Sequence, residues 1–209
     1  MPQLSSAKTL GGIGAILTLL ILVPTAGFIL NIIGWILILI ALKYIADIVN
    51  DRSIFNNAIV AAILTIVGVV AGALLVIGSV FQFFNINGYT IGSITSTTTP
   101  PSDLVGLIGG IVAGLAVIWI FTIISSIFLR RSLDKVSHSL NVNMFNTAAL
   151  LYLIGAALTI ILIGFVLLFI AEILLVVAFF SIPDNPPQVP MGQPQMMGQP
   201  PPTPAPSTS

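Results

Sequence analysis

Residues 104–129 read LVGLIGGIVAGLAVIWIFTIISSIFL, a stretch without a single charged side chain. A helix rises about 1.5 Å per residue and the hydrocarbon core of a bilayer is about 30 Å thick, so about 20 apolar residues suffice to cross it. Ser102 and Asp103, which follow two prolines, predict the start of a helix. Arg130 and Arg131 close the apolar span. This segment therefore predicts a transmembrane helix.

The whole chain shares this character, because 57% of its 209 residues are hydrophobic and only 6% are charged. An ordinary soluble domain has about one quarter charged residues. Six Lys and Arg balance six Asp and Glu, so no basic surplus is available to bind nucleic acid. The absence of cysteine excludes disulfides, thiolate metal ligands and thiol nucleophiles. We predict an all-α integral membrane protein that contacts the lipid bilayer and no nucleic acid.

The remaining apolar runs predict a polytopic transmembrane helical bundle. Residues 57–84 form one long span, whereas the runs 5–48 and 146–182 are each about twice as long as a bilayer requires. VPTAG at 23–27 provides a turn in the first run, and the second run offers only Gly164. Six spans follow if Gly164 turns the chain, and five if it does not. The predicted spans are residues 5–23, 27–46, 57–84, 104–129, 146–163 and 165–181.

An internal repeat favours six spans. IGAILTLLIL at 13–22 aligns with IGAALTIILI at 154–163. Residues 27–47 align in turn with residues 164–184. The repeat predicts a helical hairpin that is duplicated at the N-terminal and C-terminal ends of the bundle. Biased composition is the alternative explanation, because apolar segments resemble one another.

The basic residues predict the orientation in the membrane. With six spans, all of them fall on the side of the two termini: Lys8, Lys43, Arg52, Arg130, Arg131 and Lys135. The positive-inside rule assigns that side to the cytoplasm. We therefore expect a multi-pass cell-membrane protein whose transmembrane domain covers residues 1–183 and whose termini are both cytoplasmic. Five spans would place the C-terminal tail outside.

Residues 184–209 have a different composition, rich in proline, glutamine and methionine. The sequence MGQP occurs in them twice, at 191–194 and at 197–200. Such a segment predicts a disordered cytoplasmic tail with polyproline II character. The tail is either a ligand for a cytoplasmic proline-binding protein or a soluble extension without a partner.

Small residues predict where the helices pack. Lipid tails are as apolar as leucine, so helices in a membrane associate where small side chains let the backbones approach. Such residues recur every four positions in the third and fourth spans: Gly68 and Gly72, then Gly106, Gly110 and Gly114. We expect contacts within one chain, with homo-oligomerisation through the same faces as the alternative.

Two cytoplasmic loops repeat a charge pattern. Lys43 precedes Asp47 by four residues, and Arg130, which is followed by Arg131, precedes Asp134 by four. One interpretation is a paired docking surface for a protein partner or for phospholipid headgroups. The interpretation that we favour is that the basic side chains extend to the membrane surface and the carboxylates pair with them.

The stretch GFVLLFIAEILLVV at 164–177 contains Glu172, the only glutamate of the chain. It is expected near the middle of the bilayer, where an ionised carboxylate is costly, so its side chain should face the bundle and be either protonated or hydrogen-bonded. Polar residues of the neighbouring spans are Thr159, Thr122, Ser125, Ser126 and Asn31. Glu172 is therefore a candidate intramembrane polar or proton site.

The sequence contains few side chains that could act in catalysis. It contains no GxSxG, HExxH or P-loop pattern, and its sole histidine, His138, lies in a polar loop. One histidine without cysteines or an acidic cluster does not make a zinc site. We predict no catalytic residues, no metal and no cofactor. The favoured function is a non-enzymatic membrane organiser or interaction protein, and the alternative is a small-solute or proton-coupled transporter in which Glu172 titrates.

Three segments carry a family resemblance. They read PQLSSAKTLGGIGAIL at 2–17, IALKYIADIVNDRSIFNNA at 40–58 and LLYLIGAALTIILIGFVLL at 150–168. In this combination the chain resembles an archaeal family of multi-pass membrane proteins catalogued as domain of unknown function 996, over about residues 1–183. The resemblance implies an archaeal integral membrane protein and supplies no catalytic residues.

Overall fold

The structure is a computed structural model that describes residues 4–24, 26–86 and 101–184. Over these residues the regular structure is entirely helical, which confirms the predicted all-α class. The α-helices are α1 (Leu4–Leu19), α2 (Gly27–Val49), α3 (Arg52–Ile86), α4 (Pro101–Leu140), α5 (Met144–Leu158) and α6 (Ile163–Phe180). Two 3-10 turns, η1 (Leu20–Leu22) and η2 (Thr159–Ile161), extend α1 and α5. Of the predicted tail, only Asp184 lies within the described residues.

The helices have the length and composition of membrane spans. Helices α2 to α6, with η2 added to α5, are each long and apolar enough to cross a membrane. Helix α1 is apolar but shorter, with 16 residues. The predicted helical membrane bundle, with five to six such helices, is therefore confirmed.

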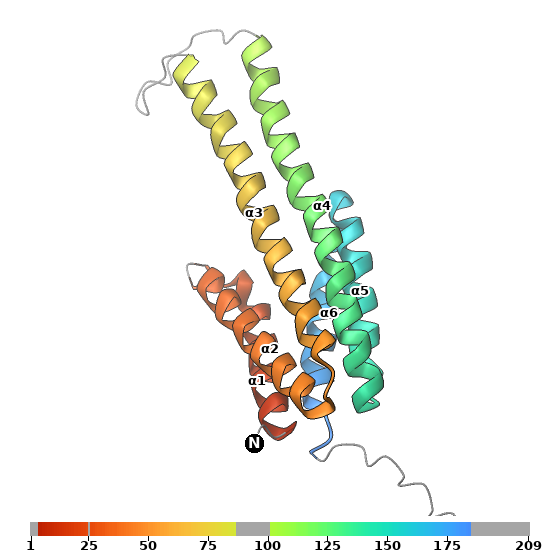
Figure 1. The fold of residues 1–209 in the computed structure, drawn as a ribbon. Coiled ribbons are helices and arrows are strands. Elements are labelled where there is room, and N and C mark those ends of the chain that lie inside the picture. Colours follow the sequence, from red (N-terminus) through yellow and green to blue (C-terminus); the bar gives the residue numbers. More distant parts are fainter. Residues whose placement is uncertain (1–3, 25, 87–100, 185–209) are drawn as a thin grey trace, which may run out of the picture.

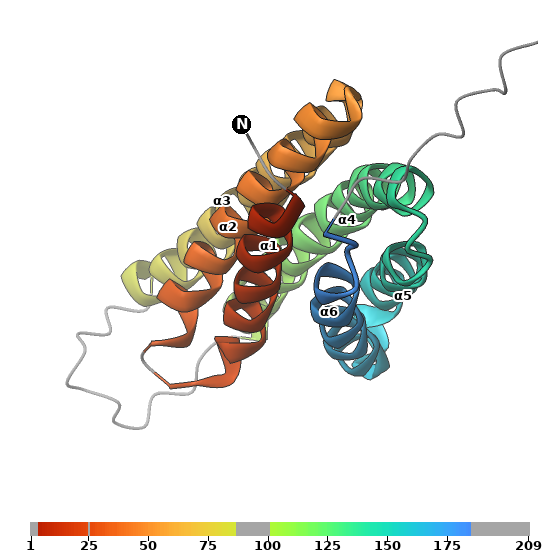
Figure 2. The ribbon, with the colours of Figure 1, turned by 90° about the horizontal axis from the view of Figure 1, so that it is seen from below.

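The helices form a closed ring of three hairpins. Helix α1 packs on α2, α3 on α4, and α5 on α6. Contacts of α2 with α3 and of α4 with α5 join neighbouring hairpins, and the contact of α1 with α6 closes the ring. Seen from below, the α1–α2 and α5–α6 hairpins lie next to each other along the α3–α4 pair, with α1 facing α6 (Figure 2). The first and last helices of the chain are thus neighbours in space.

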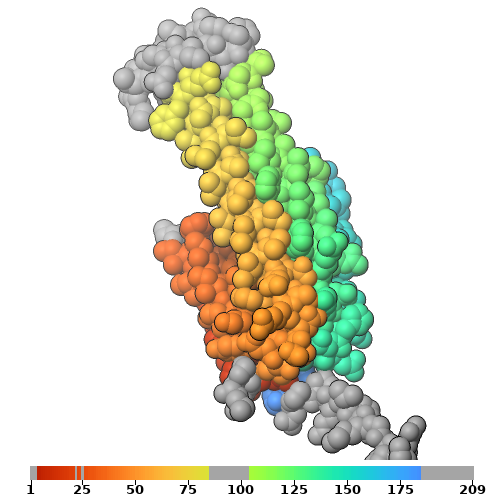
Figure 3. All heavy atoms as spheres, in the orientation of Figure 1, coloured from red at the N-terminus to blue at the C-terminus, as the bar shows by residue number. Residues whose placement is uncertain are grey.

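The middle hairpin is much longer than the other two. Helix α3 has 35 residues and α4 has 40, whereas α1, α2, α5 and α6 have between 15 and 23. The α3–α4 pair therefore rises well beyond the tips of the α1–α2 and α5–α6 hairpins (Figure 1). The upper part of the α3–α4 pair also extends beyond the other helices when all atoms are drawn as spheres (Figure 3). Only the lower part of the molecule contains all six helices.

The hydrophobic core lies in that six-helix part. Phe145 at the start of α5 and Phe179 at the end of α6 are fully buried, with their ring centroids 5.1 Å apart in an edge-to-face arrangement. Leu42 of α2, Ile54 of α3 and Leu133 of α4 supply further buried side chains to the core. This packing fixes the relative positions of the hairpins at one end of the bundle.

Each hairpin brings two glycines into close contact across its helices. The pairs are Gly14 with Gly34, Gly72 with Gly114, and Gly155 with Gly164. A Cβ atom added at Gly72 would lie 2.6 Å from the Gly114 carbonyl oxygen, and one at Gly114 would lie 2.7 Å from the Gly72 carbonyl oxygen. Such backbone contact between helices requires residues without side chains.

Four of the five predicted packing glycines lie at the α3–α4 contact. Gly72 and Gly114 face each other, Gly68 lies against the Phe121 side chain, and Gly110 lies against Ser79. Gly106 is the exception, because a Cβ there would meet nothing within 4 Å. Four residues turn a helix by about 400°, so each further glycine of the series rotates by about 40° away from the contact. The prediction for Gly106 is therefore wrong.

The chain reverses between α5 and α6 just before Gly164. Leu162 adopts the left-handed conformation with φ 64° and ends η2, and α6 begins at Ile163. A Cβ at Gly164 would collide with the backbone of Gly155 and Thr159. Gly164 thus permits the start of α6 to lie against the end of α5, while Leu162 makes the turn.

Candidate functional site

Glu172 lies in the middle of α6, and its partner is on α1. The Thr18 hydroxyl lies 2.6 Å from Glu172 Oε2, across the contact that closes the helix ring. Thr18 is buried in the last part of α1. The bond therefore joins the first hairpin of the chain to the last.

The Thr18 hydroxyl has a second partner, since it also donates to the Ala15 carbonyl oxygen at 2.8 Å. A hydroxyl carries one hydrogen but can accept from another donor. Both short contacts are satisfied together when the Glu172 carboxyl carries a proton and donates it to Thr18. An ionised Glu172 would instead compete with Ala15 for the same hydrogen.

Two further polar side chains complete this region. The Asn31 amide on α2 donates to the Thr18 carbonyl oxygen at 3.4 Å. The Tyr152 side chain on α5 lies within electrostatic range of the Glu172 carboxyl group. We call Glu172, Thr18, Asn31 and Tyr152 the Glu172 cluster. Its four members come from four different helices, α6, α1, α2 and α5.

Most of the polar neighbours expected from the sequence lie elsewhere. Thr122 and Thr159 donate to carbonyl groups of their own helical segments, and Ser126 bonds a carbonyl group of α4. Of the expected residues, only Asn31 belongs to the Glu172 cluster.

Ser125, the remaining residue of that group, links α4 to α3. Its hydroxyl lies 2.7 Å from the Thr65 hydroxyl and donates to the Ala61 carbonyl oxygen at 2.8 Å. Ser125 therefore belongs to the contact within the long hairpin.

Sequence reasoning missed Thr18 and Tyr152. A signal for Thr18 existed, because Thr18 occupies the same position in the first copy of the repeat that Thr159 occupies in the second. The choice between these two threonines depends on which helix α6 contacts, and that contact joins residues at opposite ends of the sequence. The repeat alone does not specify it.

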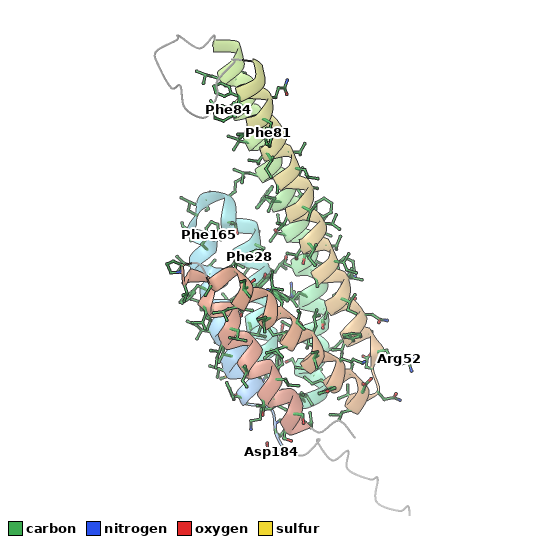
Figure 4. The ribbon with its side chains drawn as sticks, turned by 90° about the vertical axis from the view of Figure 1, so that its left-hand side faces the viewer. Phe28, Arg52, Phe81, Phe84, Phe165 and Asp184 are labelled. Atoms are coloured by element: carbon green, nitrogen blue, oxygen red, sulfur yellow. The ribbon has the colours of Figure 1, made fainter. Side chains whose placement is uncertain are left out.

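All the basic residues of the described structure, together with Asp47, Asp51, Asp134 and Asp184, lie at the end of the bundle that holds the core, whereas Asp103 belongs to the first turn of α4 at the far end (Figure 1). Lys8 and Asp184 form an ion pair at 3.4 Å, which ties the start of α1 to the segment after α6. Lys135 of α4 pairs with Asp51 at 3.2 Å. Arg52 and Asp184 mark this end in Figure 4. Both ion pairs join segments that are distant in the sequence.

Asp51 immediately precedes α3. The Ser53 backbone amide donates to Asp51 Oδ1 at 2.9 Å, and the Ser53 hydroxyl donates to the same oxygen. Lys135 in turn donates to Ser53 and Asp51. The Ser53 hydrogen bonds, assisted by the Lys135 ammonium, hold the pKa of Asp51 below its usual value of 3.8. This arrangement caps α3, and it is a cap that the sequence patterns considered above do not predict.

The repeated pairs of basic residue and aspartate do not form ion pairs in the described structure. Lys43 and Asp47 are both exposed on α2. Asp134 lies 3.6 Å from His138 Nε2 instead of pairing with Arg130. The Arg131 guanidinium lies over the Phe128 ring, 5.7 Å from its centroid. The expectation that the carboxylates pair with these bases is therefore wrong. The physical reason is that an ion pair between exposed side chains adds little stability in water.

The chain is similar to known proteins over most of its length. The family described as "Protein of unknown function (DUF996)" matches residues 30–173. The chain is 36% identical to "Uncharacterized protein MJ1644" of Methanocaldococcus jannaschii over 186 residues, an alignment that covers 88% of this chain and 95% of that relative. No solved structure matches. Three members of the Glu172 cluster lie within the matched region, and Thr18 precedes it. This membrane protein therefore belongs to the DUF996 family.

Proposed function

We propose that this protein is a non-enzymatic organiser of the cell membrane, in which the Glu172 cluster holds the bundle together. The observation that carries the proposal is the 2.6 Å contact between Thr18 and Glu172 across the first and last hairpins. The carboxyl group is engaged in a bond between helices of the same chain. Its role in this proposal is structural.

Energetics supports that role. Removing one partner of a buried hydrogen bond leaves the other unsatisfied and costs about 1–3 kcal/mol. The α1–α6 contact that this bond stabilises also closes the ring of helices. A single carboxylic acid can therefore contribute to the integrity of the whole bundle.

The outer surface supports the lipid bilayer as the main partner. Large apolar side chains are exposed on all the long helices, and the basic residues of the described structure gather at one end. By the positive-inside rule, we place that end and both termini in the cytoplasm. The proline-rich tail would then be available to a cytoplasmic protein partner, and homo-oligomerisation is an alternative.

A proton-coupled transporter is the second candidate. The convergence of Glu172, Thr18, Asn31 and Tyr152 from four helices favours it, because polar residues inside a membrane often mark ion pathways. In that case Glu172 would exchange its proton during transport. The organiser requires Glu172 to keep its hydrogen bond to Thr18, whereas the transporter requires Glu172 to release and rebind a proton.

Glu172→Gln separates the two candidates. Glutamine can donate a hydrogen bond to Thr18 but carries no exchangeable acid proton. If the role is structural, the variant keeps the thermal stability of the native protein, and neither protein conducts protons in vesicles loaded with a pH-sensitive dye. Proton flux that is present in the native protein and lost in Glu172→Gln would establish the transporter instead. Glu172→Leu is the matched control, because it removes the hydrogen bond and should lower stability.

A further inference from the structure

The long hairpin extends far beyond the tips of the short ones. The Trp119 indole donates to the Ala157 carbonyl oxygen at 3.3 Å, which places these two residues at the same level. Residues 104–118 of α4 rise about 22 Å beyond Trp119, whereas η2 ends only about 6 Å beyond Ala157. The α3–α4 pair therefore overhangs the α5–α6 tip by about 16 Å along the helix.

Four labelled phenylalanines show the arrangement. Phe28 and Phe165 lie at a similar height near the tips of the two short hairpins, and Phe81 and Phe84 lie far beyond them on α3 (Figure 4). Arg52 and Asp184 lie at the opposite end. The tips are thus between the charged end and the far end of the long hairpin.

The overhang has an apolar surface. Its strongly exposed side chains include Leu74, Ile77, Phe81, Val105, Ile108 and Val112. The described residues 75–84 and 104–118 contain no charged side chain. Water is a poor solvent for an apolar surface of this extent, so hydrocarbon should surround the overhang.

The tips of the short hairpins are apolar as well. Phe28 is 72% exposed, Leu162 is 72% exposed and Phe165 is 56% exposed. A turn within hydrocarbon must satisfy its backbone groups internally. Here Val23 and Gly27 donate to the Leu20 and Val23 carbonyl oxygens, both at 2.9 Å.

The second turn also makes internal backbone bonds. The Leu162 amide donates to the Thr159 carbonyl oxygen at 3.0 Å, and the Phe165 amide donates to the Leu162 carbonyl oxygen at 3.1 Å. Both turns therefore combine an apolar surface with internal backbone bonds among their described residues, two properties that favour a hydrocarbon environment.

Helix length does not by itself determine depth. Lys43 and Asp47 occupy the last turns of α2, which leaves residues 27–42, about 24 Å, for the apolar layer. The uncharged part of α4, residues 104–129, is about 39 Å long and fits a layer of about 30 Å when the helix tilts. The uncharged helical segment of the α1–α2 hairpin is therefore shorter than that of the long hairpin.

We propose that the α1–α2 and α5–α6 hairpins turn inside the hydrocarbon layer, so that the protein is a wedge. Six helices occupy the leaflet at the charged end, and only α3 and α4 continue through the other leaflet. A molecule with this shape expands the first leaflet more than the second. It should favour membranes in which the leaflet at the charged end is convex. This inference deepens the proposed organising function and rests on it.

The occupant of the exposed tips and overhang is lipid hydrocarbon. The overhang has exposed apolar side chains on both α3 and α4, and its length of about 16 Å is close to the thickness of one leaflet, half of a hydrocarbon core of about 30 Å. A second copy of the chain would cover only one side. Fluorescence quenching distinguishes lipid hydrocarbon from a second copy of the chain.

The chain has no cysteine, so single cysteines can be introduced for labelling. The variants are Phe28→Cys and Phe165→Cys at the tips, Phe81→Cys on the overhang, and Arg52→Cys at the charged end. Each full-length variant is labelled with an environment-sensitive fluorophore and reconstituted with lipids that carry a quencher either deep or shallow in the acyl chain. We expect the deep quencher to act most strongly at Phe28→Cys and Phe165→Cys. Aqueous iodide should quench only Arg52→Cys.

Two results would overturn the proposal. Tip labels quenched best by the shallow quencher or by iodide would mean that the short hairpins cross the bilayer fully. Tip labels protected from every quencher would mean that another protein surface, such as a second copy, covers them. Unchanged thermal stability of each variant is the folding control.

Curvature preference is measured on membrane tubes pulled from giant vesicles with the protein in one orientation. We expect a higher protein density on the tube than on the vesicle when the charged end faces the convex side, and a lower density in the opposite orientation. Equal densities in both orientations would contradict the wedge. Neither experiment measures proton flux, so a failure here is distinguishable from a failure of the non-transporting role of Glu172.

Discussion

Glu172 and Thr18 illustrate how one hydrogen bond depends on the whole topology. They are 154 positions apart in the sequence, and they meet because α6 packs against α1. In a bilayer no water is available to replace a lost partner. The bond is therefore a sensitive test of the architecture at the scale of single residues.

Thr18→Val should lower the free energy of unfolding by about 1–3 kcal/mol, because it leaves the Glu172 carboxyl without its partner. Thr18→Ser should retain most of the stability, since serine keeps the hydroxyl. Thermal unfolding of the detergent-solubilised protein checks both. Thr122→Val is a matched control, because the Thr122 hydroxyl bonds a carbonyl of its own helix. An equal loss in both valine variants would contradict a special role for Thr18.

Asp51→Ala should destabilise the protein by about 1 kcal/mol at neutral pH, the usual cost of losing a helix cap. The pKa of Asp51 is lowered from 3.8 in the folded state. Its contribution is therefore present above the unfolded-state pKa and is lost as the pH falls through the lowered folded-state pKa. The stability difference between the native protein and Asp51→Ala should shrink at acid pH. Asp47→Ala, at an exposed position of α2, controls for the loss of a surface charge.

At the scale of elements, the hairpins depend on glycines that face each other. The Gly72–Gly114 contact brings the α3 and α4 backbones together, whereas a Cβ at Gly106 of the same series would meet no neighbour. The period of the helix explains this difference, since a four-residue spacing drifts around the helix axis. Sequence spacing therefore identifies the series but not the position at which it leaves the interface.

Gly72→Ala should destabilise the protein by about 1–3 kcal/mol, because the new Cβ would lie 2.6 Å from a backbone oxygen that cannot rotate away. Gly106→Ala should change stability by less than about 1 kcal/mol, and the better helix propensity of alanine should favour a small gain. Thermal unfolding of the two variants measures the contrast. Similar losses in both would show that Gly106 is also a contact residue.

Leu162→Gly should stabilise the turn between α5 and α6. Leu162 adopts the left-handed conformation. That conformation costs a leucine about 1–2 kcal/mol, whereas glycine adopts it without that cost. The leucine side chain is largely exposed, so its removal sacrifices few protein contacts. A raised unfolding temperature is the expected result. Leu162→Val should act in the opposite direction, because a β-branched side chain fits this conformation poorly.

At the scale of the whole molecule, the unequal hairpins and the charges define two different ends. All six helices meet at the end that carries the ion pairs and the core, and α3 and α4 continue alone to the other end. All the basic residues of the described structure lie at the first of these ends, and such segregation gives the molecule a preferred orientation in a membrane.

Arg52→Cys and Asp184→Cys should react with a membrane-impermeant thiol reagent from the same side of the membrane. The positive-inside rule predicts that this is the cytoplasmic side. Labelling should therefore be efficient in inverted vesicles and weak in right-side-out cells. Labelling of the two positions from opposite sides would contradict an architecture in which they share one end.

The sequence by itself determined that this protein belongs in a membrane, that its fold class is all-α and where several of its turns lie. Hydropathy and helix-breaking residues are local properties, so the apolar runs, VPTAG at 23–27 and the glycine series were visible without a structure. Only the tertiary structure decided that Thr18 is the partner of Glu172, that Gly106 faces open space and that the hairpins reach unequal heights. Each of these depends on contacts between segments distant in the chain. Local patterns do not encode them, because the geometry of a closed helix ring is set by all its interfaces together.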